Sequence, residues 1–254
     1  MRMRIDSFGM TDTGQARDSN EDAILVEDDA RLFAVADGVG GLNAGEIASG
    51  IAVGVLESSL GSGSGPRKSV WSSWRRDLDS TQTEITDAIL NAHARIRDEA
   101  LKHGNERMAS TIAALVVRED RVTVAHVGDS RVYLLRDGTL TPLTRDHSAL
   151  TEFIDAGLPL TEEQIRNFPY RNFITRGLGL KDTVEPTVQR LQAKPGDVFL
   201  LCSDGLTSEV GEPEIEAVLE QVDGAEKACR ALVDLANQRG GSDNVSVVVV
   251  RLLA

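Results

Sequence analysis

The sequence predicts an α+β protein in which strands form the interior and helices cover them. The strands predicted at residues 122–127, 198–202 and 245–253 are apolar at nearly every position. A strand of this kind is buried on both faces, so each sheet is expected to lie between two other layers. Residues 44–60 and about 80–102 instead repeat apolar side chains at helical spacing, which predicts the covering helices.

The other elements follow in chain order. Further strands are expected at residues 2–13, 23–26, 32–36, 111–117 and 131–136. Further helices are expected at about 149–156, 161–167, 212–221 and 225–238. Asp137-Gly138 is a strong hairpin signal. No internal repeat or clean linker divides the chain, so residues 1–254 are expected to form one domain.

The composition limits the classes of partner. A net charge of -13 argues against nucleic acid, because binding to a phosphate backbone needs a basic surface. No stretch approaches the roughly 20 apolar residues that span a bilayer, and the N-terminus lacks the apolar core of a secretory signal. Cys202 and Cys229 have no metal or disulfide spacing, so we expect buried free thiols in a reducing compartment, the cytoplasm.

The stretch from Leu32 to Gly41 is the clearest candidate for a functional site. Five apolar residues run directly into Asp37, and glycines follow at positions 38, 40 and 41. Glycine permits backbone conformations and close approaches that a side chain would prevent. Two interpretations stay open from these residues alone. Asp37 caps a turn between a strand and a helix, or its carboxylate binds a metal ion.

Acidic residues recur at other places where strands meet turns. The full set is Asp22, Asp37, Asp129, Asp204 and Asp243. One such aspartate is an ordinary turn residue, but the strand ends of packed sheets can converge in space. Converging carboxylates repel each other unless cations separate them. Oxygen ligands without organised His or Cys favour Mg²⁺ or Mn²⁺ over Zn²⁺.

These acidic residues lie in motifs that follow a fixed order. The motifs are Arg17-x-x-Asn20-Glu21-Asp22, Ala36-Asp37-Gly38-x-Gly40-Gly41, Val127-Gly128-Asp129-Ser130-Arg131, Ser203-Asp204-Gly205 and Ser242-Asp243-Asn244. The set resembles the metal-dependent protein phosphatase family (PPM, the type 2C serine/threonine phosphatases) in its compact bacterial form. Each motif alone is weak, whereas the ordered set is highly specific. The resemblance implies a four-layer α/β/β/α sandwich of two packed antiparallel sheets flanked by helices.

The resemblance also implies a two-metal centre at one edge of the sandwich. Asp37 would bridge two Mn²⁺ or Mg²⁺ ions, and the backbone carbonyl of Gly38 would bind one of them. Asp204 and Asp243 would bind the other ion. Asp129, with Asp204, would hold a weaker third ion.

Four further residues are expected to assist these ligands. Asp22 would bind metal directly or through water, with Glu21 and Asn244 in supporting positions. Arg17 matches the arginine that binds the substrate phosphate in the family. A guanidinium fork fits phosphate geometry and keeps its charge at any working pH. Arg17 and Asp37 are therefore the catalytic candidates, with Arg17 as a mere surface residue the alternative.

One position departs from the family pattern. Many eukaryotic relatives have histidine after the Asp-Gly pair, a proposed general acid for the leaving alkoxide, where this chain has Val39. Valine cannot donate a proton, so a metal-bound water or another residue must do so. His147 is a candidate donor, but we favour a structural role for it, because many histidines only make local hydrogen bonds.

Two segments are candidates for contacts with other proteins. Residues 145–183 correspond to the variable flap beside the active site of the family, and such flaps select substrates and gate access. A connection of this length in a compact domain is usually functional. The loop that contains Trp71 and Trp74 is either a partner site or packs against the chain's own surface.

The implied function is hydrolysis of phosphoserine and phosphothreonine in a bacterial signalling pathway, opposite a Ser/Thr kinase. The expected partners are phosphorylated Ser/Thr proteins, including such a kinase and its substrates, with no nucleic acid and no membrane. Two alternatives remain. A binding module without turnover is suggested only by Val39, and a cation-stabilised structural domain gives no role to Arg17.

Overall fold

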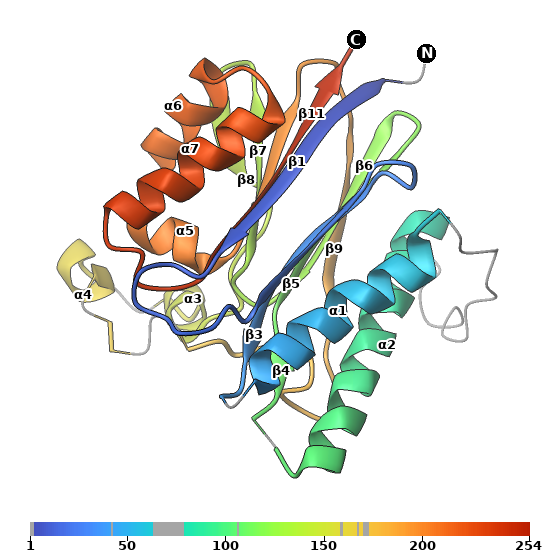
Figure 1. Cartoon of the computed structure of the whole chain (residues 1–254), viewed down its shortest axis with the longest axis vertical. Coiled ribbons are helices and arrows are strands. Elements are labelled where there is room, and N and C mark those ends of the chain that lie inside the picture. The colour runs from blue at the N-terminus through green and yellow to red at the C-terminus, as the bar shows by residue number, and fades with distance from the viewer. Residues whose placement is uncertain are drawn as a thin grey trace.

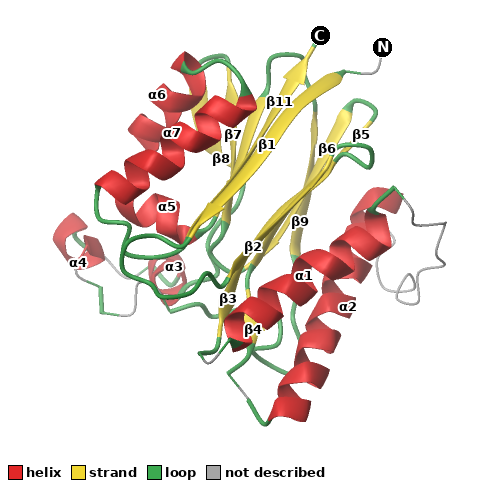
Figure 2. Cartoon of the chain, viewed as in Figure 1, coloured by secondary structure: helices red, strands yellow, loops and turns green. Residues whose placement is uncertain are grey.

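The computed structural model describes residues 3–41, 43–62, 79–105, 107–157, 160–166, 168–169 and 173–254. Two antiparallel sheets pack face to face, and helices cover the outer face of each (Figure 1). Figure 2 shows the strands as two inner layers between the helices. The four-layer α/β/β/α sandwich predicted from the sequence is therefore confirmed.

The first sheet has five strands in the order β1-β11-β10-β7-β8. Their bounds are β1 Arg4–Asp12, β7 Arg131–Arg136, β8 Thr139–Pro142, β10 Val198–Cys202 and β11 Val245–Leu253. Asp137 and Gly138 both have positive φ, 53° and 75°, and join β7 to β8 as the predicted hairpin turn. The last strand of the chain lies between the first strand and β10.

The second sheet has the order β2-β3-β5-β6-β9, and the short strand β4 pairs with β3. Their bounds are β2 Asp22–Glu27, β3 Leu32–Val39, β4 Ala109–Ser110, β5 Ile112–Arg118, β6 Arg121–Val127 and β9 Thr187–Gln192. Strands β4 and β9 were not predicted, and β8 was implied only by the hairpin signal at Asp137-Gly138. β9 is an edge strand of mostly exposed polar residues. Its hydrogen bonds to β6 make it a strand, because its sequence lacks the apolar pattern that would predict one.

The helices divide between the two outer faces. Helices α1 (Ala44–Leu60) and α2 (Ser80–His103) cover the second sheet. Helices α5 (Asp204–Glu209), α6 (Glu212–Gln221) and α7 (Ala225–Gln238) cover the first. The flap helices α3 (Ala149–Asp155) and α4 (Glu162–Arg166) lie apart from both layers in Figure 1. The sequence analysis predicted all of these except α5.

The apolar strands serve two cores at once. On β3, Phe33 and Val35 point into the core between the sheets, while Leu32, Ala34 and Ala36 pack under α1 and α2. Strand β10 alternates in the same way between the inter-sheet core and the core beneath α5 to α7. Because successive side chains point to opposite faces, burial of both faces requires continuous apolar runs.

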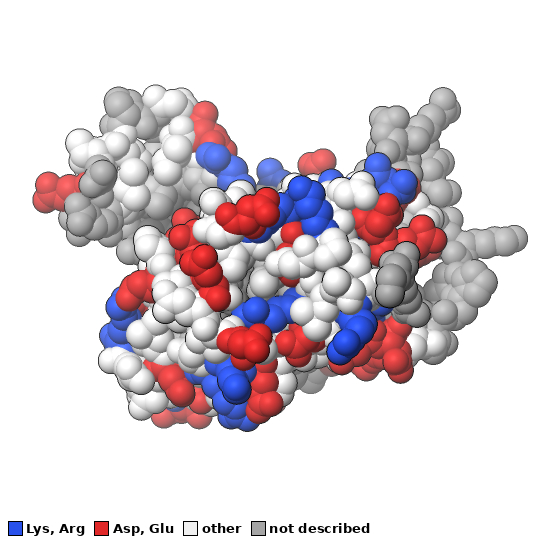
Figure 3. Space-filling model, turned by 90° about the horizontal axis from the view of Figure 1, so that it is seen from above, with Lys and Arg blue, Asp and Glu red and all other residues white. Residues whose placement is uncertain are grey.

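The surface is mixed in charge. On the face seen in Figure 3, acidic and basic side chains are interspersed, without a continuous basic surface. None of the described helices is long and apolar enough to cross a membrane. Cys202 and Cys229 are buried and free, as predicted. Trp71 and Trp74 lie outside the described residues, so the two interpretations of their loop remain hypotheses.

Candidate metal centre

Strand pairing brings four of the aspartates to one end of the sandwich. Asp22 and Asp37 are direct cross-strand partners in β2 and β3. Asp204 follows the end of β10, and Asp243 precedes the start of β11. Because β10 and β11 are antiparallel neighbours, these last two aspartates enter the site from adjacent chain segments.

A hydroxyl group links the two sheets at this end. Ser203, directly after β10, donates a hydrogen bond from Oγ to Asp22 Oδ2 at 2.7 Å. The backbone N–H of Ser246 donates to the same Ser203 Oγ at 3.0 Å. The strand ends of one sheet thereby hold a carboxylate of the other in a fixed position.

Asp129 joins the group through the turn between β6 and β7. Its neighbour Ser130 shares a hydrogen bond of 2.7 Å with the hydroxyl of Thr111. Thr111 also accepts from the Asp37 N–H at 2.9 Å and donates its own N–H to the Asp37 carbonyl at 2.8 Å. The hydroxyls of Thr111 and Ser130 thus link the turn at Asp129 to the backbone of Asp37.

Two glycines permit close backbone packing around the aspartates. A Cβ atom on Gly38 would overlap the Gly45 carbonyl at the start of α1. A Cβ atom on Gly205 would overlap the Asn244 carbonyl directly before β11. Glycine is therefore required after both Asp37 and Asp204, because a helix start or strand start approaches the backbone there.

Burial and mutual repulsion shift the pKa values of these carboxyl groups. Burial raises the pKa of Asp37 well above its ordinary value, and the neighbouring aspartates raise it further. Burial also raises the pKa of Asp22 to about 7, although hydrogen bonds from Ser246 and Ser203 oppose the shift. The pKa of Asp129 is raised to about 7 by burial and by Asp204. The pKa of Asp204 is raised by burial and by Asp243.

The cluster has the chemistry of a divalent cation site. Asp22 Oδ1 and Asp204 Oδ1 are buried without a hydrogen-bond partner in the described part of the chain. An unpaired buried oxygen is costly, and a cation would satisfy it. Among the described residues, no three His, Cys, Asp or Glu side chains form a group that could hold an ion by themselves. The support for a cation is the chemistry of the donors, because carboxylate oxygens are the ligands of hard ions such as Mg²⁺, which keep several waters of their own.

Arg17 lies at the rim of the cluster and contacts one of its carboxylates. Its Nη2 donates to Asp243 Oδ2 at 2.7 Å, and its side chain is 51% exposed. This hydrogen bond raises the pKa of Arg17, which stays charged. A guanidinium group has five N–H donors, so most of them remain available to an incoming phosphate.

Glu21 and Asn244 act on the loop before β2. The Glu21 N–H donates to Asn244 Oδ1 at 2.8 Å. Asn244 Nδ2 donates to the carbonyls of Thr13 and Ser19, both at 2.9 Å. The Glu21 carbonyl accepts the N–H of Gly38 at 3.1 Å. Both residues therefore position backbone around Asp22 and Asp37, and their supporting role at a metal centre remains a prediction.

The structure supports the structural interpretation of His147. Its Nδ1 accepts the N–H of Gly128 at 3.1 Å, and its ring stacks on His126 with a centroid distance of 4.5 Å. Burial, together with the charges of His126 and Arg176, lowers the pKa of His147 to about 3. A ring that is neutral near pH 7 has no acidic proton for a leaving alkoxide. Val39 is 45% exposed and offers none either.

The residues that hold the aspartates in place were not predicted from the sequence. Ser203 was noted only as a letter of the Asp204 motif, and Thr111 only as the first residue of a predicted strand. Ser130 and Arg131 were noted only as letters of the Asp129 motif. The hydroxyl or charged residues beside the aspartates could have suggested such a supporting role. Their hydrogen-bond partners, however, lie far away in the sequence and could not be identified from it.

The raised pKa values predict how the metal-free protein responds to pH. Asp22 and Asp129 hold protons up to about pH 7 in the folded state, against about pH 4 in an unfolded chain. Their contribution to stability is therefore present below about pH 4 and is lost as the pH rises to about 7. In EDTA, the melting temperature should rise by ~3 °C or more from about pH 8 to about pH 5.5, which corresponds to about 1 kcal/mol.

Differential scanning calorimetry measures this response. Asp129→Asn should reduce the rise, whereas Asp182→Asn, at a side chain that is 93% exposed, should leave it unchanged. An equal rise in wild type and Asp129→Asn would show that the cluster does not cause it.

Comparisons with known proteins agree with this geometry. Residues 14–245 match the family model described as protein phosphatase 2C. A protein phosphatase 2C-type protein of Streptococcus pyogenes is 35% identical over 243 residues, which cover 94% of each chain. The serine/threonine protein phosphatase PstP of Mycobacterium tuberculosis is 37% identical over 94% of this chain, but over only 43% of its own length.

Solved structures show the same fold. The serine/threonine phosphatase of S. agalactiae superposes with a TM-score of 0.86 at 34% identity, covering 97% of this chain and 99% of that one. The catalytic domain of PstP in complex with two manganese ions has a TM-score of 0.83 at 30% identity, covering 99% and 100%. The chain therefore belongs to the protein phosphatase 2C family of metal-dependent serine/threonine phosphatases.

Proposed function

We propose that the chain hydrolyses phosphoserine and phosphothreonine in proteins, using Mn²⁺ or Mg²⁺ held by its strand-end aspartates. The observation that carries this proposal is the convergence of half-buried aspartates from both sheets, in which two carboxylate oxygens have no hydrogen-bond partner among the described residues. Membership of the family supports the reaction, and the PstP neighbour with two manganese ions supports the choice of cation.

Each aspartate has a proposed part in metal binding. Asp37 has two oxygens and feels the charges of the other four aspartates, so it would suit a position shared by two ions. Gly38 would offer its carbonyl to one ion, while Asp204 and Asp243 would bind the other. Asp129 would bind a weaker third ion, and Asp22 would bind directly or through water.

The protein's own residues would orient the substrate around these ions. When bound, a pair of divalent cations activates a water molecule for attack on phosphorus and stabilises the charge that develops. Arg17, exposed at the rim, would grip the phosphate with the N–H donors that Asp243 does not use. Because Val39 and His147 have no acidic proton, we propose that water protonates the leaving serine or threonine oxygen.

The setting is part of the same proposal. We place the enzyme in the cytoplasm of a bacterium, because buried free thiols such as Cys202 and Cys229 suit a reducing compartment. Its proposed substrates are phosphorylated Ser/Thr proteins, among them a Ser/Thr kinase and the targets of that kinase. We propose one catalytic domain over residues 1–254, with residues 145–183 as the flap. The adjacency of the first and last strands supports this division.

Substitution of Asp37 tests the proposed reaction. Asp37→Asn keeps the side-chain size but removes the charge that would hold two cations, so kcat/KM should fall by ~1000-fold or more, about 4 kcal/mol. The assay is phosphate release from a phosphothreonine peptide in Mn²⁺, and EDTA should abolish it in wild type. The exposed Asp182→Asn is the matched control and should retain wild-type activity. Metal-independent turnover, or a fully active Asp37→Asn, would refute the mechanism, and peptide binding without phosphate release would indicate a binding module.

Substitution of His147 tests the source of the leaving-group proton. Asn retains an acceptor where His147 Nδ1 meets the Gly128 N–H, so His147→Asn should change kcat by less than ~10-fold. The measurement compares kcat for a phosphothreonine peptide with kcat for an aryl phosphate, whose leaving group needs no proton. A loss of ~100-fold or more with the peptide alone would identify His147 as the general acid after all.

A further inference from the structure

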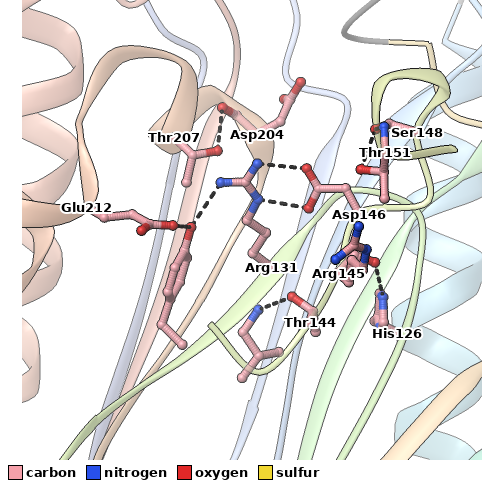
Figure 4. A network of polar contacts seen from close by, with 12 residues as sticks. His126, Arg131, Thr144, Arg145, Asp146, Ser148, Thr151, Asp204, Thr207 and Glu212 are labelled. Carbon is pink, nitrogen blue, oxygen red and sulfur yellow. Dashed lines mark hydrogen bonds and ion pairs between the residues drawn. The ribbon is translucent and has the colours of Figure 1, made fainter. Parts of the chain in front are cut away.

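Arg131 lies in β7, two residues after Asp129, and points toward Asp146 at the start of the flap (Figure 4). Its Nε donates to Asp146 Oδ1 at 2.8 Å and its Nη2 to Oδ2 at 2.7 Å. Two parallel charge-assisted hydrogen bonds of this kind fix direction as well as distance. A strand that leads away from Asp129 is thereby tied to the base of the flap.

The other end of the guanidinium group is also held. Arg131 Nη1 donates to Tyr133 Oη at 3.0 Å, and Tyr133 Oη donates to Glu212 at the start of α6 at 3.1 Å. Tyr133 is fully buried. All three nitrogens of Arg131 therefore have partners, and the group cannot rotate without breaking several bonds.

The residue after Asp146 bonds to the turn itself. The His147 N–H donates to the Gly128 carbonyl at 2.9 Å, and the Gly128 N–H donates to His147 Nδ1 at 3.1 Å. His147 also joins the two arms of the flap base, because its carbonyl accepts the Thr175 N–H at 2.8 Å. The flap base therefore contacts the Asp129 turn both before and after the aspartate.

We infer that Arg131 is a positioning residue: through Asp146 it holds the turn of Asp129 between the flap base and Asp37. On its far side, the turn is held by the hydrogen bond between the hydroxyls of Ser130 and Thr111, and Thr111 also bonds to the Asp37 backbone. With both sides fixed, the carboxylate of Asp129 keeps its place relative to the other aspartates. The inference rests on the proposed metal function. It assigns Arg131 and Asp146 a role in binding the weaker third ion, the one proposed at Asp129.

The same strand provides a matched control. Arg136, at the far end of β7, donates from Nε and Nη2 to the two oxygens of Asp197, both at 2.7 Å. This pair has the same bidentate geometry as that of Arg131, and it is also partly buried. Its hydrogen-bond partners among the described residues are Asp197 and the Gln192 carbonyl, which belong neither to the flap nor to the strand-end aspartates. Arg136→Lys therefore reproduces the loss of a guanidinium fork without touching the site.

The experiment measures Mn²⁺ binding to the full chain by isothermal titration calorimetry, without substrate. Lysine keeps the charge at position 131 but cannot form the fork. Arg131→Lys and Asp146→Asn should each weaken the weakest Mn²⁺ site by ~10-fold or more, as is usual when a residue that orients a ligand is lost. Arg136→Lys should change its Kd by less than ~2-fold. The melting temperature of each variant reports whether it is folded.

A double variant completes the test. Arg131→Lys with Asp146→Asn should bind Mn²⁺ no more weakly than either single variant, because the two residues act as a pair. Additive losses, an unchanged Kd in Arg131→Lys, or an equal loss in Arg136→Lys would overturn the inference. The Kd for Mn²⁺ is measured without substrate, so it does not depend on catalysis. If Arg131→Lys weakens Mn²⁺ binding but the wild-type protein releases no phosphate, the proposed function is refuted and the positioning role is still supported.

Discussion

The central constraint on this structure is that half-buried carboxylates, which repel one another, are held together at one end of the sandwich. Burial and neighbouring negative charges together raise the pKa of Asp37. A folded chain tolerates such an arrangement only when other interactions hold the groups together. The inter-sheet core does this, because residues such as Phe33 and Phe199 are fully buried and fix the strands. The aspartates lie at or next to the ends of the strands of the two sheets, so the packing of the strands keeps them together.

Hydrogen bonds then hold the Asp22 carboxylate, the Asp37 backbone and the Asp129 turn in place. Ser203 from the first sheet bonds to Asp22 in the second, and Thr111 links Asp37 to the Asp129 turn. Arg17 and Arg131 provide positive charge at the edges, and Arg131 is among the charges that favour ionised Asp129. Divalent cations would relieve the repulsion that remains, so stability, metal binding and catalysis depend on the same charges.

Much of this architecture could be predicted from the sequence, for identifiable reasons. The helices at 212–221 and 225–238 and the strand at 245–253 have the predicted bounds, since their apolar patterns are strong. Strand β9 was missed because it is polar and paired only at one edge, and α5 because it has six residues. The aspartates were recognisable as strand ends. Their supports were not, because bonds such as Ser203 to Asp22 join residues 181 positions apart. For the same reason, the contact between Arg17 and Asp243 could not be foreseen.

The most direct test of this account is a crystal structure with Mn²⁺, in which anomalous scattering locates the ions. We expect two strong peaks about 3.5–4 Å apart between the strand ends, with Asp37 in contact with both. A weaker third peak is expected beside Asp129. A single peak, or none within reach of Asp37, would contradict the claim that these carboxylates converge in order to share divalent cations.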